Sequence, residues 1–330
     1  MGQEHNAGDD DRRVVVGIDI GGTKTALLAT EVAGGSDLGS ESFPTPAEDG
    51  PDALLDALDE AIRATLRTSG RDVADLCAVG IAAPGMVNAG RGRVVEAGNL
   101  DGWRDLPLRD LVERRFHVPV FVEQDANAAA LGEKWRGAAR QMNNFAFVAL
   151  GTGIGVGLVI NGRLHRGFHN AAGEVGNFVM GREYLGEREA DGVGNLARLI
   201  GGKTLRRRAE DAAGEEMSAA EAIDRGADAI EGNGGDDDLA PLAEDAIEYV
   251  AMTVVAIAAL LDPEAVILGG GTAEAGAALI DPVRDLVARE LPAPPAIMHA
   301  VLGPAAQLHG AVFGALWQLD PDLALREELR

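Results

Sequence analysis

Residues 14–30 of this 330-residue chain read VVVGIDIGGTKTALLAT, and this stretch determines how the fold begins. The run that ends at Ile20 is almost entirely apolar, which predicts a buried strand. Gly21-Gly-Thr-Lys24 is typical of a tight turn, and residues 25–30 form a second apolar run. The opening unit is therefore predicted to be a hairpin, with Asp19 just before its turn.

Strands and helices alternate in the residues that follow. Apolar residues recur at helical spacing over residues 51–67, and a buried strand is expected at 78–83. A helix over 106–115 then leads into a short strand at 118–122. This alternation predicts an α/β lobe.

The middle of the chain repeats the opening pattern. An alanine-rich helix is expected over residues 126–140, because alanine has the highest helix propensity. Two strands, 144–150 and 155–160, then flank a second glycine turn at Gly151-Thr-Gly153. This rough duplication suggests a cleft between two similar halves, with a phosphate held from both sides.

The last third contains a charged stretch and three further elements. Residues 206–238 are predicted to form surface helical segments and an exposed loop, as in a solvated insertion. A long helix over 237–261, a strand at 265–268 and a final helix over 310–319 come next. We expect the final helix to pack back on the first lobe.

Composition limits the class of partner. The chain is 46% hydrophobic and carries 53 acidic against 29 basic side chains, a net charge of -24. Such a surface repels nucleic acid and anionic lipid, so neither is expected as a partner. It also suits a salt-rich cytoplasm, where screening removes self-repulsion, and predicts a halophilic source.

The cysteine count and the first residues indicate the compartment. Cys77 is the only cysteine, which excludes an intrachain disulfide and a cysteine-based zinc cluster. Residues 1–13 are polar and have no signal-peptide core, and no apolar run has the length of a membrane span. A cytoplasmic protein is expected.

The common phosphate-binding motifs do not fit the glycine turns. The P-loop requires a helix after its Gly-Lys-Ser/Thr, but a strand follows Lys24. The glycines of 151–157 and 269–274 are out of register for a dinucleotide fingerprint. In the first turn, bare glycine backbone with Thr23 and Lys24 could bind an anion, and Asp19 could hold Mg²⁺ directly or through water. The alternative for this turn alone is an ordinary hairpin.

Seven short motifs in a fixed order give a specific resemblance that covers almost the whole chain. The sequence resembles the ROK family of sugar kinases, within the actin, hexokinase and Hsp70 superfamily. The motifs are Asp19-Ile-Gly-Gly-Thr-Lys24, Gly80-Ile-Ala-Ala-Pro-Gly85, Asp125-Ala-Asn-Ala-Ala-Ala-Leu-Gly-Glu133, Gly151-Thr-Gly-Ile-Gly155, Ala172-Gly-Glu-Val-Gly176, Gly269-Gly-Gly271 and Leu308-His-Gly-Ala311.

The resemblance implies an α/β, two-lobed, ribonuclease-H-like fold of the actin/hexokinase ATPase type with a central cleft. A polar tail, residues 1–13, would precede a small N-terminal lobe. That lobe would comprise 14–124 with a C-terminal helix over about 308–330, and 125–307 would form the large lobe. A homodimer or homotetramer is also implied.

The resemblance further implies an ATP and Mg²⁺ site and a general base. Asp125 would accept the proton of a sugar hydroxyl, and the N-terminus of the following helix favours its ionised form. The alternative is a plain N-cap aspartate. The turn of Gly21, Gly22, Thr23 and Lys24 would grip the ATP phosphates together with Gly151, Thr152 and Gly153, and the adenosine would lie against Gly269, Gly270 and Gly271.

The sugar contacts depart from the family pattern. Asn99 and Glu174 match retained sugar ligands, although a turn asparagine and a surface carboxylate are the alternatives. Gln124 replaces the asparagine that usually precedes the catalytic aspartate, and Asn177 replaces a histidine that contacts sugar and often zinc. No zinc site is expected. Ala197 falls where a third sugar-binding carboxylate is usual, with Glu187 or Glu189 as substitutes.

Together these features predict ATP-dependent phosphorylation of a sugar hydroxyl, of the hexokinase or glucokinase type. Another sugar or polyol, such as fructose, an amino sugar or inositol, is an alternative substrate. A catalytically silent sugar or nucleotide sensor is a second alternative. A DNA-binding repressor is disfavoured, because the residues before Val14 are too few for a helix-turn-helix domain.

Overall fold

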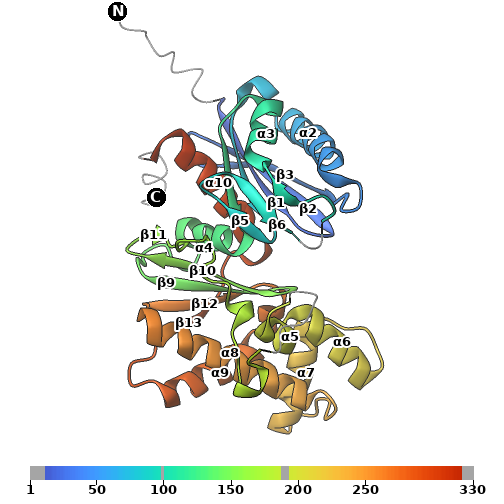
Figure 1. The fold of residues 1–330 in the computed structure, drawn as a ribbon, viewed down its shortest axis with the longest axis vertical. Helices are drawn as coiled ribbons and strands as arrows, with labels where there is room; N and C mark the ends of the chain where they lie inside the picture. Colours follow the sequence, from blue (N-terminus) through green and yellow to red (C-terminus); the bar gives the residue numbers. More distant parts are fainter. Residues whose placement is uncertain (1–11, 98–99, 187–192, 322–330) are drawn as a thin grey trace, which may run out of the picture. The chain divides into compact units, whose positions relative to one another are not determined.

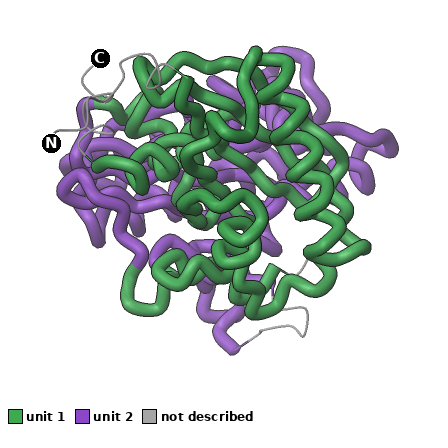
Figure 2. The backbone as a smooth tube through the Cα atoms, turned by 90° about the horizontal axis from the view of Figure 1, so that it is seen from above, with its two compact units in different colours: residues 1–140, 167–171, 305–330 green, residues 141–166, 172–304 purple. Residues whose placement is uncertain are grey.

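The computed structural model describes residues 12–97, 100–186 and 193–321, and the chain forms two compact units. Unit 1 comprises residues 1–140, 167–171 and 305–330 (Figure 2, green). Unit 2 comprises residues 141–166 and 172–304 (Figure 2, purple). The α/β class predicted from the sequence is confirmed in both units.

Unit 1 is built on a five-stranded mixed sheet of order β3-β2-β1-β4-β8 (Figure 1). β1 and β2 form the predicted antiparallel hairpin, and β1, β4 and β8 run parallel. β3 was not predicted, because its polar, mostly exposed residues lack an apolar period. The strands are β1 (Val14–Ile20), β2 (Lys24–Glu31), β3 (Asp37–Pro44), β4 (Leu76–Ala83) and β8 (Val120–Gln124), and a small antiparallel sheet adds β5 (Met86–Asn88), β6 (Arg93–Glu96) and β7 (Arg104–Leu106).

Helices cover both faces of this sheet. Val14 and Val16 of β1 belong to the core formed with α2 (Gly50–Thr68) and α3 (Leu108–Phe116). Val15, which points to the opposite face, packs in the core of α10 (Ala306–Leu319). The final helix therefore packs on the first unit, as predicted.

Glycines allow α10 to lie directly on the backbone of its neighbours. A Cβ atom at Gly80 of β4 would stand 1.8 Å from the carbonyl oxygen of Ala311. One at Gly132 of α4 (Asp125–Arg136) would stand 2.1 Å from the carbonyl oxygen of Ala306. This close packing of α4 on α10 explains why residues 125–140 belong to unit 1, whereas the sequence placed the lobe boundary after residue 124.

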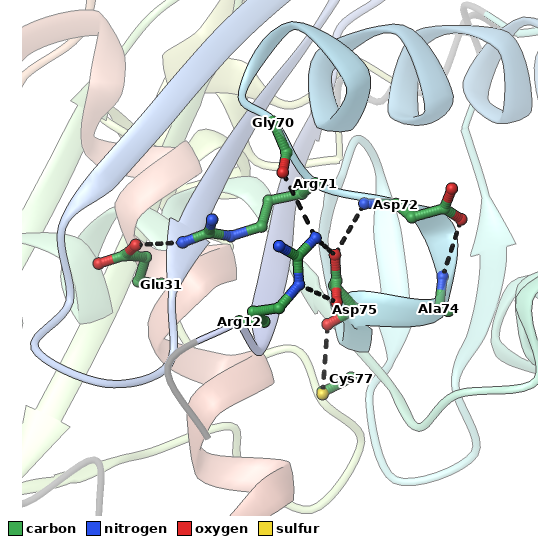
Figure 3. Close-up of polar contacts among 8 residues, drawn as sticks. All are labelled: Arg12, Glu31, Gly70, Arg71, Asp72, Ala74, Asp75 and Cys77. Atoms are coloured by element: carbon green, nitrogen blue, oxygen red, sulfur yellow. Dashed lines mark hydrogen bonds and ion pairs between the residues drawn. The ribbon is translucent and has the colours of Figure 1, made fainter. Parts of the chain in front are cut away.

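Polar contacts fix the start of β1 to the loop that precedes β4 (Figure 3). The Arg12 guanidinium donates to both carboxylate oxygens of Asp75, at 3.1 and 2.9 Å, and its hydrogen bond holds the pKa of that carboxyl below the usual range. Asp75 also accepts the backbone N–H of Asp72, which completes a capping box. Beside them, Arg71 pairs with Glu31 at 2.5 Å. The Arg12–Asp75 contacts secure the start of β1 to the segment before β4, and the Arg71–Glu31 pair secures the end of β2 to the residues that follow α2.

Unit 2 repeats the sheet-and-helix plan with the strand order β11-β10-β9-β12-β13. β9 and β10 form the second predicted hairpin, and β12 lies parallel to β9. The strands are β9 (Phe145–Leu150), β10 (Ile154–Ile160), β11 (Arg163–Leu164), β12 (Ala265–Gly269) and β13 (Ala296–His299), and the helices are α5 (Asn195–Ile200), α6 (Gly202–Ala213), α7 (Ala219–Glu231), α8 (Ala240–Leu261) and α9 (Ala277–Glu290).

The interpretation of residues 206–238 as a solvated insertion was wrong for α7. Ala222 and Ile223 are fully buried in the core of unit 2, and α7 packs on α8. Charged residues on the outer face of this amphipathic helix obscured its apolar stripe. The loop over 232–238 is largely exposed, as expected. Within the described part of the chain, no helix is long and apolar enough to cross a membrane.

Candidate nucleotide and substrate site

The parallel strands of unit 1 bring Asp19 and Asp125 to one edge of the sheet. Asp19 on β1 pairs with Ala82 on β4, and Ala82 pairs with Glu123 on β8. Gln124 ends β8, and Asp125 begins α4 directly after it. Both aspartates thus lie at the carboxyl ends of parallel strands, where open α/β sheets usually bind ligands.

The two carboxylates interact electrostatically. Burial and, to a smaller extent, the negative charge of Asp125 raise the pKa of Asp19 to about 7, while Lys24 acts in the opposite direction. A divalent cation would offset the repulsion between the two carboxylates, and Mg²⁺ commonly binds one or two carboxylates together with substrate phosphates. Asp19 therefore fits an Mg²⁺ ligand. Among the described residues, no group of three or more His, Cys, Asp or Glu side chains is placed to hold a metal ion by itself.

Asp125 occupies the first helical position of α4 and not the N-cap position. The N-cap residue is Gln124, whose backbone is extended and whose side chain makes no capping hydrogen bond. The Oδ1 atom of Asp125 accepts the Ala126 backbone N–H at 2.6 Å. The carboxylate thus lies in the first turn, where the helix dipole favours its charged form.

Glu123 is a residue that the sequence analysis missed. Its side chain is 1% exposed, and its Oε1 atom accepts the Gln124 backbone N–H at 3.1 Å and the Asn127 side-chain N–H at 3.0 Å. These bonds tie together residues on both sides of Asp125. A charged residue at the end of an apolar strand, four positions before an asparagine, was the available signal.

The first glycine turn is braced by Thr45. Gly21 donates its N–H to the carbonyl oxygen of Lys24 at 3.0 Å. The Thr45 hydroxyl donates to the Gly21 carbonyl at 2.7 Å, and the Thr45 N–H donates to the Thr23 carbonyl at 3.0 Å. Gly22 is half-buried, and the Thr23 and Lys24 side chains remain exposed. The turn is held in shape while its donors stay accessible.

Unit 2 brings the second glycine turn and the third glycine motif together. A Cβ atom at Gly270, whose φ is +90°, would stand 2.6 Å from the carbonyl oxygen of Leu150, the residue before Gly151. Added Cβ atoms at Gly151, Gly153 and Gly271 would meet nothing within 4 Å. Gly269, the last residue of β12, pairs with Ala149 of β9. Close backbone approach and open space suit a nucleotide lying on bare backbone.

The first residues of α6 hydrogen-bond to the second glycine turn. The Gly202 N–H donates to the Gly151 carbonyl at 2.9 Å, and the Lys203 N–H donates to the Thr152 carbonyl at 3.3 Å. A helix N-terminus thus lies beside the residues predicted to bind phosphate, which adds a favourable dipole.

The predicted sugar ligands of unit 2 lie near one short turn. Glu174 is half-buried and immediately precedes the 3₁₀ turn η2 (Val175–Asn177), and Asn177 is exposed. A Cβ atom at Gly176 would stand 3.5 Å from the Cβ of Ala197. Ala197 therefore lies beside the Glu174 motif, where it supplies no polar group. Asn99, Glu187 and Glu189 lie outside the described residues.

The sheets and the site define a protein of the actin-like ATPase fold. A ROK hexokinase from Thermus thermophilus superposes with a TM-score of 0.76 at 32% identity and covers 93% of this chain and 99% of its own. A ROK family glucokinase from Streptomyces griseus, in complex with glucose and AMPPNP, gives a TM-score of 0.73 at 30% identity, covering 92% and 99%. Residues 15–320 match the ROK family, and the chain belongs to it.

Curated relatives include enzymes and regulators. A glucokinase of Halalkalibacterium halodurans is 31% identical over 280 residues, which is 82% of this chain and 84% of the relative. A glucokinase of Streptomyces coelicolor is 35% identical over 285 residues, or 82% and 86%. A xylose repressor of Bacillus subtilis is 32% identical over 165 residues, but covers only 50% of this chain and 42% of its own.

Proposed function

We propose that the protein transfers the γ-phosphoryl group of ATP to a sugar hydroxyl, as a kinase of the glucokinase type. The observation that carries this proposal is the electrostatic coupling of Asp125, at the start of α4, with the half-buried Asp19 beside the glycine turn. The glucokinase relatives support the class of reaction, and the AMPPNP complex of one relative supports ATP as the donor.

In the proposed reaction, Asp125 accepts the proton as the sugar oxygen attacks the γ-phosphorus. The bond from the γ-phosphorus to the bridging oxygen breaks, and ADP leaves. The turn at residues 21–24 orients phosphate oxygens through backbone N–H groups, and Lys24 adds positive charge. Mg²⁺, held at Asp19, would neutralise charge on the phosphates. Glu123 keeps Asp125 in place through the hydrogen bonds that flank it.

The sugar's identity depends on Gln124, Glu174 and Asn177, with Asn99 as a further proposed contact. All four can hydrogen-bond hydroxyl groups. The histidine and the third carboxylate that are usual in the family are replaced by Asn177 and Ala197. We therefore expect the selectivity among sugars that differ in their hydroxyl groups to differ from that of a standard family glucokinase. Glucose is the first candidate, and fructose, amino sugars and inositol are the alternatives.

An ADP-release assay with Mg²⁺-ATP and a panel of sugars and polyols tests the proposal. We expect one substrate to drive turnover, and Asp125→Asn to bind ATP normally but to lose at least a thousandfold in kcat. Asp285→Asn, an exposed change on α9 with the same loss of charge, is the matched control and should retain full activity. Near-normal turnover by Asp125→Asn would refute the role of this residue.

A catalytically silent sensor is the second candidate, favoured by the altered sugar-ligand positions Gln124, Asn177 and Ala197. It predicts a sugar-dependent rise in melting temperature without ADP release from any member of the panel. ADP release with one sugar would exclude it.

A further inference from the structure

Asn127 is a buried polar residue in a part of α4 that is otherwise apolar. Its side chain is 4% exposed, and buried alanines flank it at residues 126 and 128–130. Its Oδ1 atom is buried and has no hydrogen-bond partner among the described residues. A buried acceptor without a donor is unfavourable, and asparagine has a lower helix propensity than alanine. The stability of the helix therefore does not explain why an asparagine stands here.

The amide nitrogen of Asn127 has a defined partner. It donates to the Oε1 atom of Glu123 at 3.0 Å, and the same oxygen accepts the backbone N–H of Gln124 at 3.1 Å. A carboxylate oxygen is an acceptor, so it requires the amide nitrogen and not the amide oxygen. The bond to Glu123 thus sets the orientation of the amide and leaves Oδ1 as the unpaired atom.

These two hydrogen bonds hold the start of a helix that has no ordinary cap. The N-cap residue Gln124 makes no side-chain capping bond, and the first turn of a helix contains backbone N–H groups without intrahelical partners. Glu123 belongs to β8, where it pairs with Ala82 of β4, whereas Asn127 belongs to α4. The Oε1 atom of Glu123 therefore joins the sheet to the residues on both sides of Asp125.

We infer that Asn127 is a positioning residue for Asp125, which acts through the Glu123 carboxylate and not through contact with substrate. The inference rests on the proposed function for the role of Asp125 as proton acceptor. Without the Asn127 amide, the Oε1 atom of Glu123 would lose one of its two hydrogen bonds described above, and the first turn of α4 would gain freedom. A displacement of about 1 Å in a reacting group can cost about a hundredfold in rate.

Steady-state kinetics of Asn127→Ala separates positioning from binding and from folding. We expect kcat to fall at least tenfold, while KM for ATP and for the sugar changes less than about threefold. Asn233→Ala is the matched control, because the Asn233 amide donates to the Glu231 carboxylate at 2.9 Å in an exposed loop of unit 2. This control should keep both constants. A retained kcat in Asn127→Ala, with or without a lower melting temperature, would overturn the proposal.

Variants of Glu123 test whether the two residues act as one unit. In Glu123→Gln the side-chain carbonyl oxygen can accept the same two N–H groups, so kcat should stay within about threefold of the wild type. Glu123→Ala should lose about as much kcat as Asn127→Ala, and the double variant should lose no more than either, because both changes break the same link. Losses that multiply in the double variant would show independent roles and overturn the proposal.

Amide hydrogen exchange at Gln124 and Ala126 measures the same link without sugar or ATP. Asn127→Ala should accelerate exchange at both amides at least tenfold, and Asn233→Ala should leave it unchanged. If no sugar supports ADP release by the wild type while exchange behaves in this way, the proposed kinase fails and the role of Asn127 in placing Asp125 stands. Unchanged exchange in Asn127→Ala would overturn that role, whatever the activity of the wild type.

Discussion

The replacement Asp19→Asn should make the protein more stable, and the gain should grow with pH. In the unfolded chain Asp19 ionises above its ordinary pKa of 3.8, whereas in the folded protein it keeps its proton up to about pH 7. Unfolding therefore releases a proton in this interval, and the free energy of unfolding of the wild type falls as the pH rises through it. Each pH unit contributes about 1.4 kcal/mol, which gives about 4 kcal/mol over the whole interval.

Tryptophan fluorescence in urea is a suitable assay, because all three tryptophans, Trp103, Trp135 and Trp317, belong to unit 1. Mg²⁺ must be absent, since a bound cation would stabilise the ionised carboxylate. Between about pH 5 and about pH 8, the stability difference between Asp19→Asn and the wild type should increase by about 3 kcal/mol and then level off.

Asp125→Asn provides the control for the cause of the shift. This change removes the negative charge that, after burial, contributes most to the raised pKa of Asp19. The pKa of Asp19 should therefore fall, and the free energy of unfolding should depend less on pH. Introducing Asp19→Asn into that background should then give a smaller pH-dependent gain. A difference between Asp19→Asn and the wild type that does not change with pH would refute the assignment of a desolvated, charge-coupled carboxylate.

Three further outcomes follow from the packing. Gly80→Ala should lower the free energy of unfolding by about 3 kcal/mol in urea titrations, because its methyl group meets the Ala311 carbonyl, and an unchanged midpoint would contradict that contact. Gly151→Ala, with open space around its new Cβ, should alter stability by less than about 0.5 kcal/mol but weaken ATP binding at least tenfold by calorimetry. Arg136→Lys should lower the free energy of unfolding by about 1 kcal/mol in thermal unfolding, since the guanidinium stacks 3.8 Å from the centre of the Trp135 ring. An unchanged free energy of unfolding would show that the stacking is unimportant.

Local patterns predicted the elements that carry the site. The β1–β2 hairpin, the buried strand β4 and the α4 helix after Asp125 have strong periodicity or propensity, and each lies within a few residues of its predicted position. The order of short motifs then identified the family without any structural information. These predictions succeeded because they depend on neighbouring residues in the chain.

Tertiary effects were not predictable in the same way. The raised pKa of Asp19 needs the register of β1, β4 and β8, which places Asp125 nearby. The burial of Glu123 and the packing of α7 on α8 depend on surfaces that meet only in the fold. The assignment of α4 to unit 1 depends on glycines that matter through their contact with α10.

Salt dependence, oligomeric state and substrate remain predictions. The family comparisons do not support a halophilic source, which rests on the charge of -24 alone. The interpretation of this charge as an adaptation to salt predicts that molar KCl raises the melting temperature by screening surface repulsion. A melting temperature that is independent of KCl would remove this interpretation.

The position of α10 affects how the protein is made on the ribosome. Residues 306–319 cover one face of a sheet whose first strand begins at Val14, so almost three hundred residues must be translated between that strand and the helix that covers it. Unit 2 is contained in residues that emerge earlier. The growing chain therefore carries an uncovered apolar surface until residues 306–319 emerge, and a premature stop before residue 306 would leave that surface available for aggregation or chaperone binding.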